Sequence, residues 1–122
     1  MARLGTVTAE GRPHVVPCCF AVEGDVLYTG VDDVKAKRTT ALRRLENIAR
    51  HPEVTVLVDH YDDDWSALWW IRLDGRATVV DAGSPDGDVG RELLAAKYEQ
   101  YRATPIERAV VVVEIRRWRA WP

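Results

Sequence analysis

A basic segment at residues 35–44 is the part of this sequence best suited to binding chemistry. Five cations fall within these ten residues and no acid does: Lys35, Lys37, Arg38, Arg43 and Arg44. Apolar residues at helical spacing predict a helix over residues 39–50, ended by His51 and Pro52. The cations therefore sit at a helix start, where the backbone already carries partial positive charge and each costs about 0.3–1 kcal/mol.

A second predicted helix, over residues 89–101, has the opposite charge arrangement. Asp86 and Asp88 precede it and Glu92 lies in its first turn, as the helix dipole favours. The second helix thus has the acids that a helix N-terminus favours, whereas the first helix has cations there. A bound anion resolves the difference, because free amides, hydroxyls and cations together form a phosphate site. The alternative is a solvated face of surface charge, and the residues alone leave both readings open.

The elements around this segment predict a mainly β protein with two short helices. Strands are expected over residues 2–9, 14–22, 26–31, 53–59, 66–80 and 109–121, with 66–80 read either as one strand or as two broken near Asp74 and Gly75. The first three should form an antiparallel meander. Short connections favour an antiparallel sheet closed into a barrel, with one helix plugging an open end. We expect one domain over residues 1–122.

The predicted second strand is apolar on both faces. Because side chains alternate along a strand, one face carries Val16, Cys18, Phe20 and Val22. The other face carries Val15, Pro17, Cys19 and Ala21. A strand with one wet face should alternate with polar residues. One face should therefore meet the barrel core, and the other a partner subunit or a flat ligand.

Composition narrows the class of protein. The chain is 47% hydrophobic and 30% charged, with a formal net charge of -2, which argues against a general nucleic-acid binder. No apolar run approaches the roughly 20 residues of a membrane span, and no secretion signal is visible. Cys18 and Cys19 are adjacent and read as reduced thiols, so we expect a cytoplasmic protein. Five tryptophans suggest surface covered by a ligand or a second subunit.

The order of motifs resembles the pyridoxamine 5′-phosphate oxidase-like split β-barrels, and within them the F420-dependent (deazaflavin) branch. The motifs that carry the resemblance run along nearly the whole chain: ARLGTV (2–7), GRPHVVP (11–17), LYT (27–29), KAKRT (35–39), LRRL (42–45), HPEV (51–54), VLVDHYDDDW (56–65) and LWW (68–70). The arginine- and lysine-rich motifs of true pyridoxamine phosphate oxidases are not evident. Relatives usually begin with a helix before the first strand, so either the start is trimmed or a rim of the pocket is missing.

The resemblance implies a homodimer with two cofactors in grooves at its interface. Lys37, Arg38 and Thr39, with Lys35 nearby, would hold the cofactor phosphate. Val16, Pro17 and Cys18 would line the ring through backbone contacts, with Thr29 beside them. Trp70, or its neighbour Trp69, would close the pocket from the other subunit.

The function that the resemblance implies is hydride transfer between reduced F420 and a small unsaturated substrate. The alternatives are an FMN-dependent enzyme of the same fold, a non-catalytic F420 carrier, and a dimer whose basic segment meets an acidic protein. We assign no catalytic side chain. We also assign no metal site, because the acids around His60 match no ligand spacing and read as a surface turn. Cys18 reads as pocket lining, and His14 and Tyr61 as strand-end residues.

Overall fold

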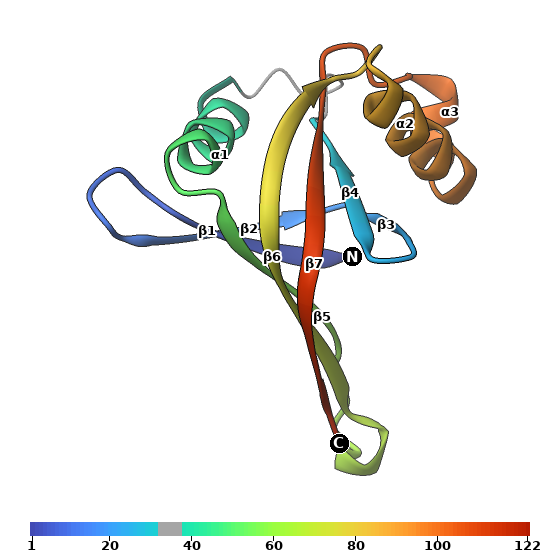
Figure 1. Ribbon diagram of the computed structural model, residues 1–122. Helices are drawn as coiled ribbons and strands as arrows, with labels where there is room; N and C mark the ends of the chain where they lie inside the picture. Colours follow the sequence, from blue (N-terminus) through green and yellow to red (C-terminus); the bar gives the residue numbers. More distant parts are fainter. Residues whose placement is uncertain (32–37) are drawn as a thin grey trace.

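The computed structural model describes residues 1–31 and 38–122, with side chains described from residue 43 onward in the second range. Within these residues the chain forms an antiparallel sheet and three α-helices, which confirms the predicted fold class (Figure 1). The strands are β1 (Ala2–Val7), β2 (Pro13–Cys18), β3 (Ala21–Glu23), β4 (Val26–Gly30), β5 (Glu53–His60), β6 (Trp69–Asp81) and β7 (Ala109–Trp121). The helices are α1 (Arg38–Arg50), α2 (Pro85–Lys97) and α3 (Glu99–Ala103), with a 3-10 turn at Trp65–Ala67.

The two edge strands of this sheet are consecutive in sequence. The strand order is β2-β1-β5-β6-β7-β4-β3, so β2 and β3 stand at opposite ends of seven strands. Only Cys19 and Phe20 separate them. Three backbone steps span about 10 Å at most, so the sheet must curl until its edges meet. The result is the barrel that the sequence predicts.

The prediction of one continuous strand over residues 14–22 is wrong, because the chain leaves the ladder at this corner. The phenolic oxygen of Tyr98 lies 3.2 Å from both backbone polar atoms of Phe20, accepting from its N–H and donating to its carbonyl. Lys97 Nζ donates to the same carbonyl at 2.7 Å and sits 3.5 Å from the centre of the Phe20 ring. These partners replace a strand neighbour. The predicted meander is wrong for the same reason, since β2 and β3 do not pair.

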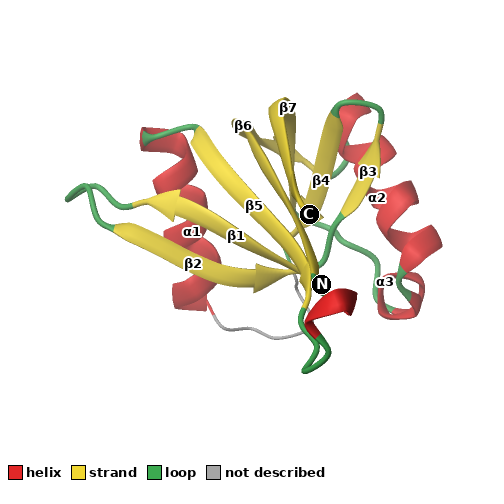
Figure 2. Ribbon diagram, turned by 90° about the horizontal axis from the view of Figure 1, so that it is seen from below, coloured by secondary structure: helices red, strands yellow, loops and turns green. Residues whose placement is uncertain are grey.

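The barrel interior forms the first of two hydrophobic cores. Buried residues come from every wall of the barrel, including Leu4 of β1, Leu27 of β4, Val56 of β5 and Leu73 of β6. Ile48 of α1 joins this cluster and is 2% exposed. Helix α1 therefore covers one end of the barrel, as Figures 1 and 2 show.

The second core lies between the barrel wall and helices α2 and α3. Tyr28, Leu94, Tyr101 and Ile106 are buried there. Strand β7 serves both cores, because Val111 and Val113 face the barrel interior while Val110 faces the helices. A strand covered on both faces has no need of polar alternation, which explains its run of four valines at 110–113.

The second predicted helix begins earlier than its periodicity indicated. Helix α2 starts at Pro85, and the Ser84 hydroxyl caps it by accepting from Gly87 N–H at 3.1 Å. Residues 82–88 are thus only partly loop, and the predicted 89–101 helix is divided into α2 and α3 at Tyr98. Its first turn holds Asp86 and Asp88, whereas the first turn of α1 holds no acid. The two helices of the structure therefore differ in the charge of their first turns, as the sequence predicts.

Of the two interpretations of residues 66–80, the single strand is confirmed, but β6 begins only at Trp69, after the 3-10 turn, and it carries a bulge at Asp74 and Gly75. A Cβ at Gly75 would overlap the Glu114 carbonyl, so this position requires glycine. Beyond the bulge, β5, β6 and β7 run past the barrel as a three-stranded projection, tipped by the turn at 61–68 (Figures 1 and 2). We call this projection the stalk. Among the described helices, none is long and apolar enough to cross a membrane.

Removing the Tyr98 hydroxyl should destabilise the barrel corner. We expect Tyr98→Phe to lower the free energy of unfolding by about 1–3 kcal/mol, because both backbone atoms of Phe20 lose a partner. Tyr61→Phe is the matched control, since that side chain is 72% exposed. Urea denaturation of both variants measures the difference. Equal loss of stability in the two variants would contradict this role of Tyr98.

Candidate functional site

The residues predicted to hold a cofactor lie on both sides of the barrel wall. Val16 and Cys18 face the interior, whereas Pro17 is exposed on the outer face, the face turned away from the barrel core. Thr29 is fully buried in the interior, and Trp70 lies on the outer face of the stalk. Inside one chain, these residues do not converge on a single pocket.

The predicted phosphate residues are described only in part. Lys35 and Lys37 lie outside the described residues. Arg38 and Thr39 are the first two residues of α1, and their side chains are also outside the description. Their grouping around a phosphate therefore stays a prediction.

Cys18 and Thr29 meet inside the barrel. Burial raises the pKa of the Cys18 thiol. The neighbouring Thr29 hydroxyl and Arg44 guanidinium lower that pKa, but their effect is smaller than the effect of burial. The thiol is therefore held neutral, which suits a lining residue better than a nucleophile. Thr29 Oγ1 makes no hydrogen bond of ordinary geometry with the described residues, although it lies close enough to lower that pKa.

Helix α1 adds two polar side chains to this end of the barrel. Asn47 Nδ2 donates to Thr6 Oγ1 at 3.1 Å, so this buried pair is satisfied. Arg44 is only 8% exposed, and its Nε has no hydrogen-bond partner among the described residues. A buried cation is costly without a counter-charge. The orphaned Arg44 Nε and Thr29 Oγ1 thus fit a ligand that brings anionic or carbonyl oxygens to this end.

A cavity of about 580 Å³ opens on the outer face of the stalk. Trp70 of β6 stands directly opposite Trp121 of β7, and both side chains line it. The remaining walls come from β5, β6 and the stalk turn: Thr55, Leu57, Asp59, His60, Tyr61, Leu68, Trp69 and Arg72. Aromatic and aliphatic walls with a few polar groups are typical of a site for a flat organic molecule.

A second hollow, of about 420 Å³, lies on the same outer face. Gly5 of β1 and the 64% exposed Val15 of β2 are among the residues that line it. Thr55 lines both hollows, so they belong to one continuous surface. The outer face of β2 is uncovered within the chain, as expected if a partner subunit covers it.

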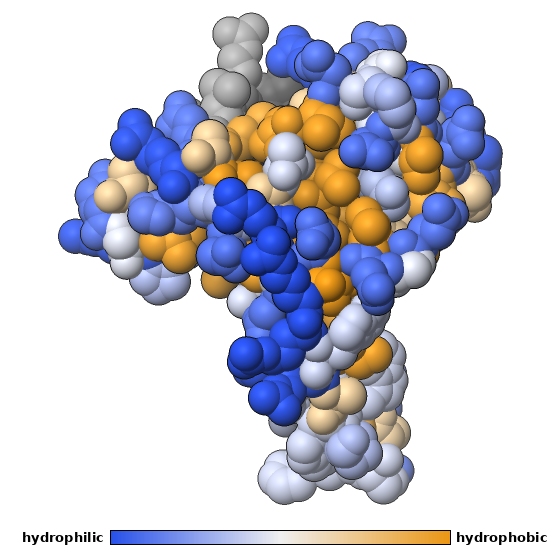
Figure 3. All heavy atoms as spheres, viewed as in Figure 1, coloured by the Kyte–Doolittle hydropathy of each residue, from blue (hydrophilic) through white to orange (hydrophobic). Residues whose placement is uncertain are grey.

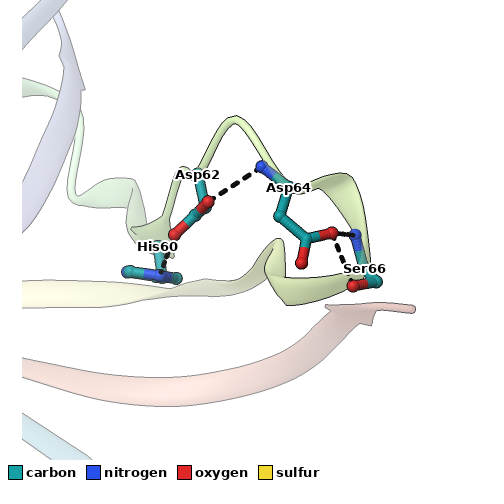
Figure 4. A network of polar contacts seen from close by, with 4 residues as sticks. All are labelled: His60, Asp62, Asp64 and Ser66. Atoms are coloured by element: carbon teal, nitrogen blue, oxygen red, sulfur yellow. Dashed lines mark hydrogen bonds and ion pairs between the residues drawn. The ribbon is translucent and has the colours of Figure 1, made fainter.

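The acidic turn at the stalk tip uses its carboxylates locally (Figure 4). Asp64 Oδ1 accepts from Ser66 Oγ at 2.6 Å and from Ser66 N–H at 3.0 Å, which lowers the pKa of Asp64. Asp62 Oδ1 accepts from Asp64 N–H at 2.8 Å, and its other oxygen lies 3.6 Å from His60 Nε2. In the described ranges, no group of three His, Cys, Asp or Glu side chains could hold a metal.

An antiparallel barrel with cavities on its outer face is the architecture of split-barrel proteins. The chain belongs to the pyridoxamine 5′-phosphate oxidase family, whose model matches residues 1–122. No match was found among curated proteins.

Solved structures of this fold bind different groups. The chain is similar to a heme binding protein from Mycobacterium smegmatis, at 18% identity and a TM-score of 0.75, over 98% of this chain and 48% of that one. It therefore spans about half of that protein's length. HutZ, the heme storage protein of Vibrio cholerae, is 13% identical with a TM-score of 0.74, over 98% and 83% of the two chains. A FAD-binding protein from Mesorhizobium loti is 19% identical with a TM-score of 0.67, over 98% and 81%. At these identities the likeness shows the fold alone.

The two cysteines should differ in reactivity. In Cys19→Ala, the remaining Cys18 should react with iodoacetamide at pH 8 about tenfold or more slowly than Cys19 does in Cys18→Ala, because burial and a raised pKa both limit the thiolate. Mass spectrometry over time measures the two rates. The difference should vanish in denaturant, and equal rates in the folded variants would refute it.

Proposed function

We propose that this protein is a homodimer that holds F420 and uses it to transfer a hydride to or from a small unsaturated substrate. The observation that carries the proposal is the stalk cavity of about 580 Å³, with Trp70 and Trp121 on its walls. Indole side chains supply flat apolar surface for a ring system. Family membership supports a cofactor of the flavin class.

A second subunit is required because the predicted residues are divided between two faces. Cys18 and Thr29 lie inside the barrel, whereas Trp70 lies outside on the stalk. A partner's stalk laid across the barrel end would supply the missing wall. The exposed apolar side chains of the outer face, Val15 and Trp121 among them, are the surface such a contact would bury.

The phosphate of the cofactor is assigned to Lys35, Lys37, Arg38 and Thr39. Support comes from the first turn of α1, which contains no acid, and from the buried Arg44 that follows it. Cations, hydroxyls and free helix amides suit a phosphate group.

The chemistry resides in the cofactor, since reduced F420 supplies the hydride when it is bound. The chain binds the phosphate, presents one ring face and excludes water with its aromatic walls. Burial raises the pKa of Cys18, so its thiol would line the pocket in the protonated form without transferring a proton. No side chain of this chain is assigned as an acid or a base.

Heme binding is the second candidate, favoured by one observation on the stalk. His60 lies at the rim of the aromatic cavity and stacks on Trp69, with ring centres 6.3 Å apart. Histidine is a common heme ligand, and two of the similar structures are heme proteins by name.

Two further alternatives stay close to the proposed function. FMN is the alternative cofactor within the flavin class, and a carrier that holds F420 without turnover is the alternative to an enzyme.

Titration with F420 and with FMN tests the proposal. We expect micromolar or tighter binding of F420, and failure of both cofactors to bind would refute it. Lys37→Gln combined with Arg38→Gln should weaken binding about a hundredfold or more, because charge-assisted hydrogen bonds contribute about 1.5–3 kcal/mol each. Arg12→Gln, a cation in an exposed turn, is the control and should bind normally.

A charge on the outer face should dissociate the dimer. We expect Val15→Glu to give a monomer in sedimentation equilibrium, because a carboxylate buried at an apolar interface lacks a partner. Val22→Glu is the matched control, at an exposed valine of β3, and should stay dimeric. If both variants dissociate, or neither does, the interface lies elsewhere.

A further inference from the structure

Two rows of like side chains cross the outer face of the stalk. The ladder between β6 and β7 sets Trp70 opposite Trp121 and, two residues along, Arg72 opposite Arg119. Alternation along the strands keeps all four side chains on the same face. An indole row therefore runs beside a guanidinium row.

The pair of guanidinium groups, Arg72 and Arg119, destabilises the sheet when no ligand is bound. Like charges directly opposite in an antiparallel pair destabilise a sheet. The Nε atom of Arg72 is buried without a hydrogen-bond partner among the described residues, although it forms an ion pair with Asp74 Oδ1 at 3.8 Å, a distance too long for a hydrogen bond. The outer face therefore carries a hydrogen-bond donor beside the cavity, the N–H of Arg72 Nε, that no described residue accepts from.

The acids nearby are already engaged. Asp59 accepts from Arg3 Nη1 at 2.7 Å. Asp74 accepts from Thr55 Oγ1 at 2.9 Å and stands opposite Arg117 in the ladder. Asp74 thus divides its charge between Thr55 and its ion pair with Arg72, and Arg119 has no ion pair among the described residues, so an external anion would supply the counter-charge that the row lacks.

The cavity beside this row is large enough for a ring system. It measures about 580 Å³ and combines the indoles with Leu57 and Leu68, while Arg72 lines its edge. Figure 3 shows apolar atoms gathered over the barrel body between the helices, with the stalk mostly pale or hydrophilic. The stalk surface in this view is thus less apolar than the body, and the side chains on its outer face include the paired tryptophans and arginines.

We propose that the stalk cavity takes a planar aromatic ligand that carries carboxylate groups, with its ring on Trp70 and Trp121 and its carboxylates on Arg72 and Arg119. The proposal deepens the proposed function and rests on it for the role of Trp70. Arginine forks match carboxylates in a bidentate manner, which gives direction as well as charge. Arginine forks also fit phosphate, but the proposed function assigns the cofactor phosphate to the basic segment. The row is then left for a second anionic group, which F420 has in its glutamyl arm and FMN lacks. The propionates of a porphyrin are the other source of the same chemistry.

Three probes and two variants test the inference: F420, FMN and hemin, each titrated by quenching of tryptophan fluorescence. In Arg72→Gln/Arg119→Gln, we expect the dissociation constant for F420 to rise about tenfold or more, while that for FMN changes less than about twofold. Arg116→Gln is the matched control, because Arg116 is a neighbour on β7 that lies 3.9 Å from Glu114. It should leave all three affinities unchanged.

Stability without ligand separates binding from folding. Arg119→Gln alone should unfold at the same or a higher urea concentration than the parent protein, because it relieves like-charge repulsion. A lower midpoint would mean that Arg119 is a structural partner and would overturn the inference.

The remaining outcomes are distinct. Equal losses for F420 and FMN in the double variant, or the same loss in Arg116→Gln, would overturn the inference and leave the proposed function standing. Hemin binding that depends on the arginine row, without F420 binding, would support the inference and overturn the proposed cofactor. If no probe binds, both fail.

Discussion

The two-residue connection between β2 and β3 is the constraint on which the structure depends. It joins strands at opposite edges of the sheet, so it can exist only if the sheet curls into a barrel. Closure then divides every strand into an inner and an outer face. The corner is held from outside by Tyr98 and Lys97, which bind the backbone of Phe20. Helices α2 and α3 therefore belong to the closure of the barrel as much as to the second core.

Closure also explains why the residues predicted for one site lie on two different surfaces of the chain. The interior end, with Cys18, Thr29 and Arg44, holds buried polar atoms that lack partners among the described residues. The outer face holds the aromatic cavity and the arginine row. A barrel wall separates the two, so no movement of side chains can unite them within a subunit. In the dimer proposed above, a second copy would bring its outer face against the end of the first barrel.

The sequence predicted those features that depend on local pattern. Residues 109–121 form a strand with the predicted bounds, and the 39–50 helix differs from α1 by one residue. Pro17 stands one residue before the break after Cys18, but the hydroxyl that replaces the strand partner there lies 78 positions away, beyond the reach of local pattern. The arginine row was missed for a related reason. Arg72 meets Arg119 only in one register, and the bulge at Asp74 and Gly75 sets that register.

The pairing of β4 with β7 has a consequence for how the chain reaches this fold. Thr29 lies opposite Val111, about 80 positions further along, so this contact is among the most distant in the sequence. Chains dominated by such contacts fold slowly, because loop closure precedes the gain from pairing. During synthesis, β1 to β6 emerge before the strand that completes both cores. The edges of β4 and β6 then remain open to other chains, and pairing with β7 ends that exposure.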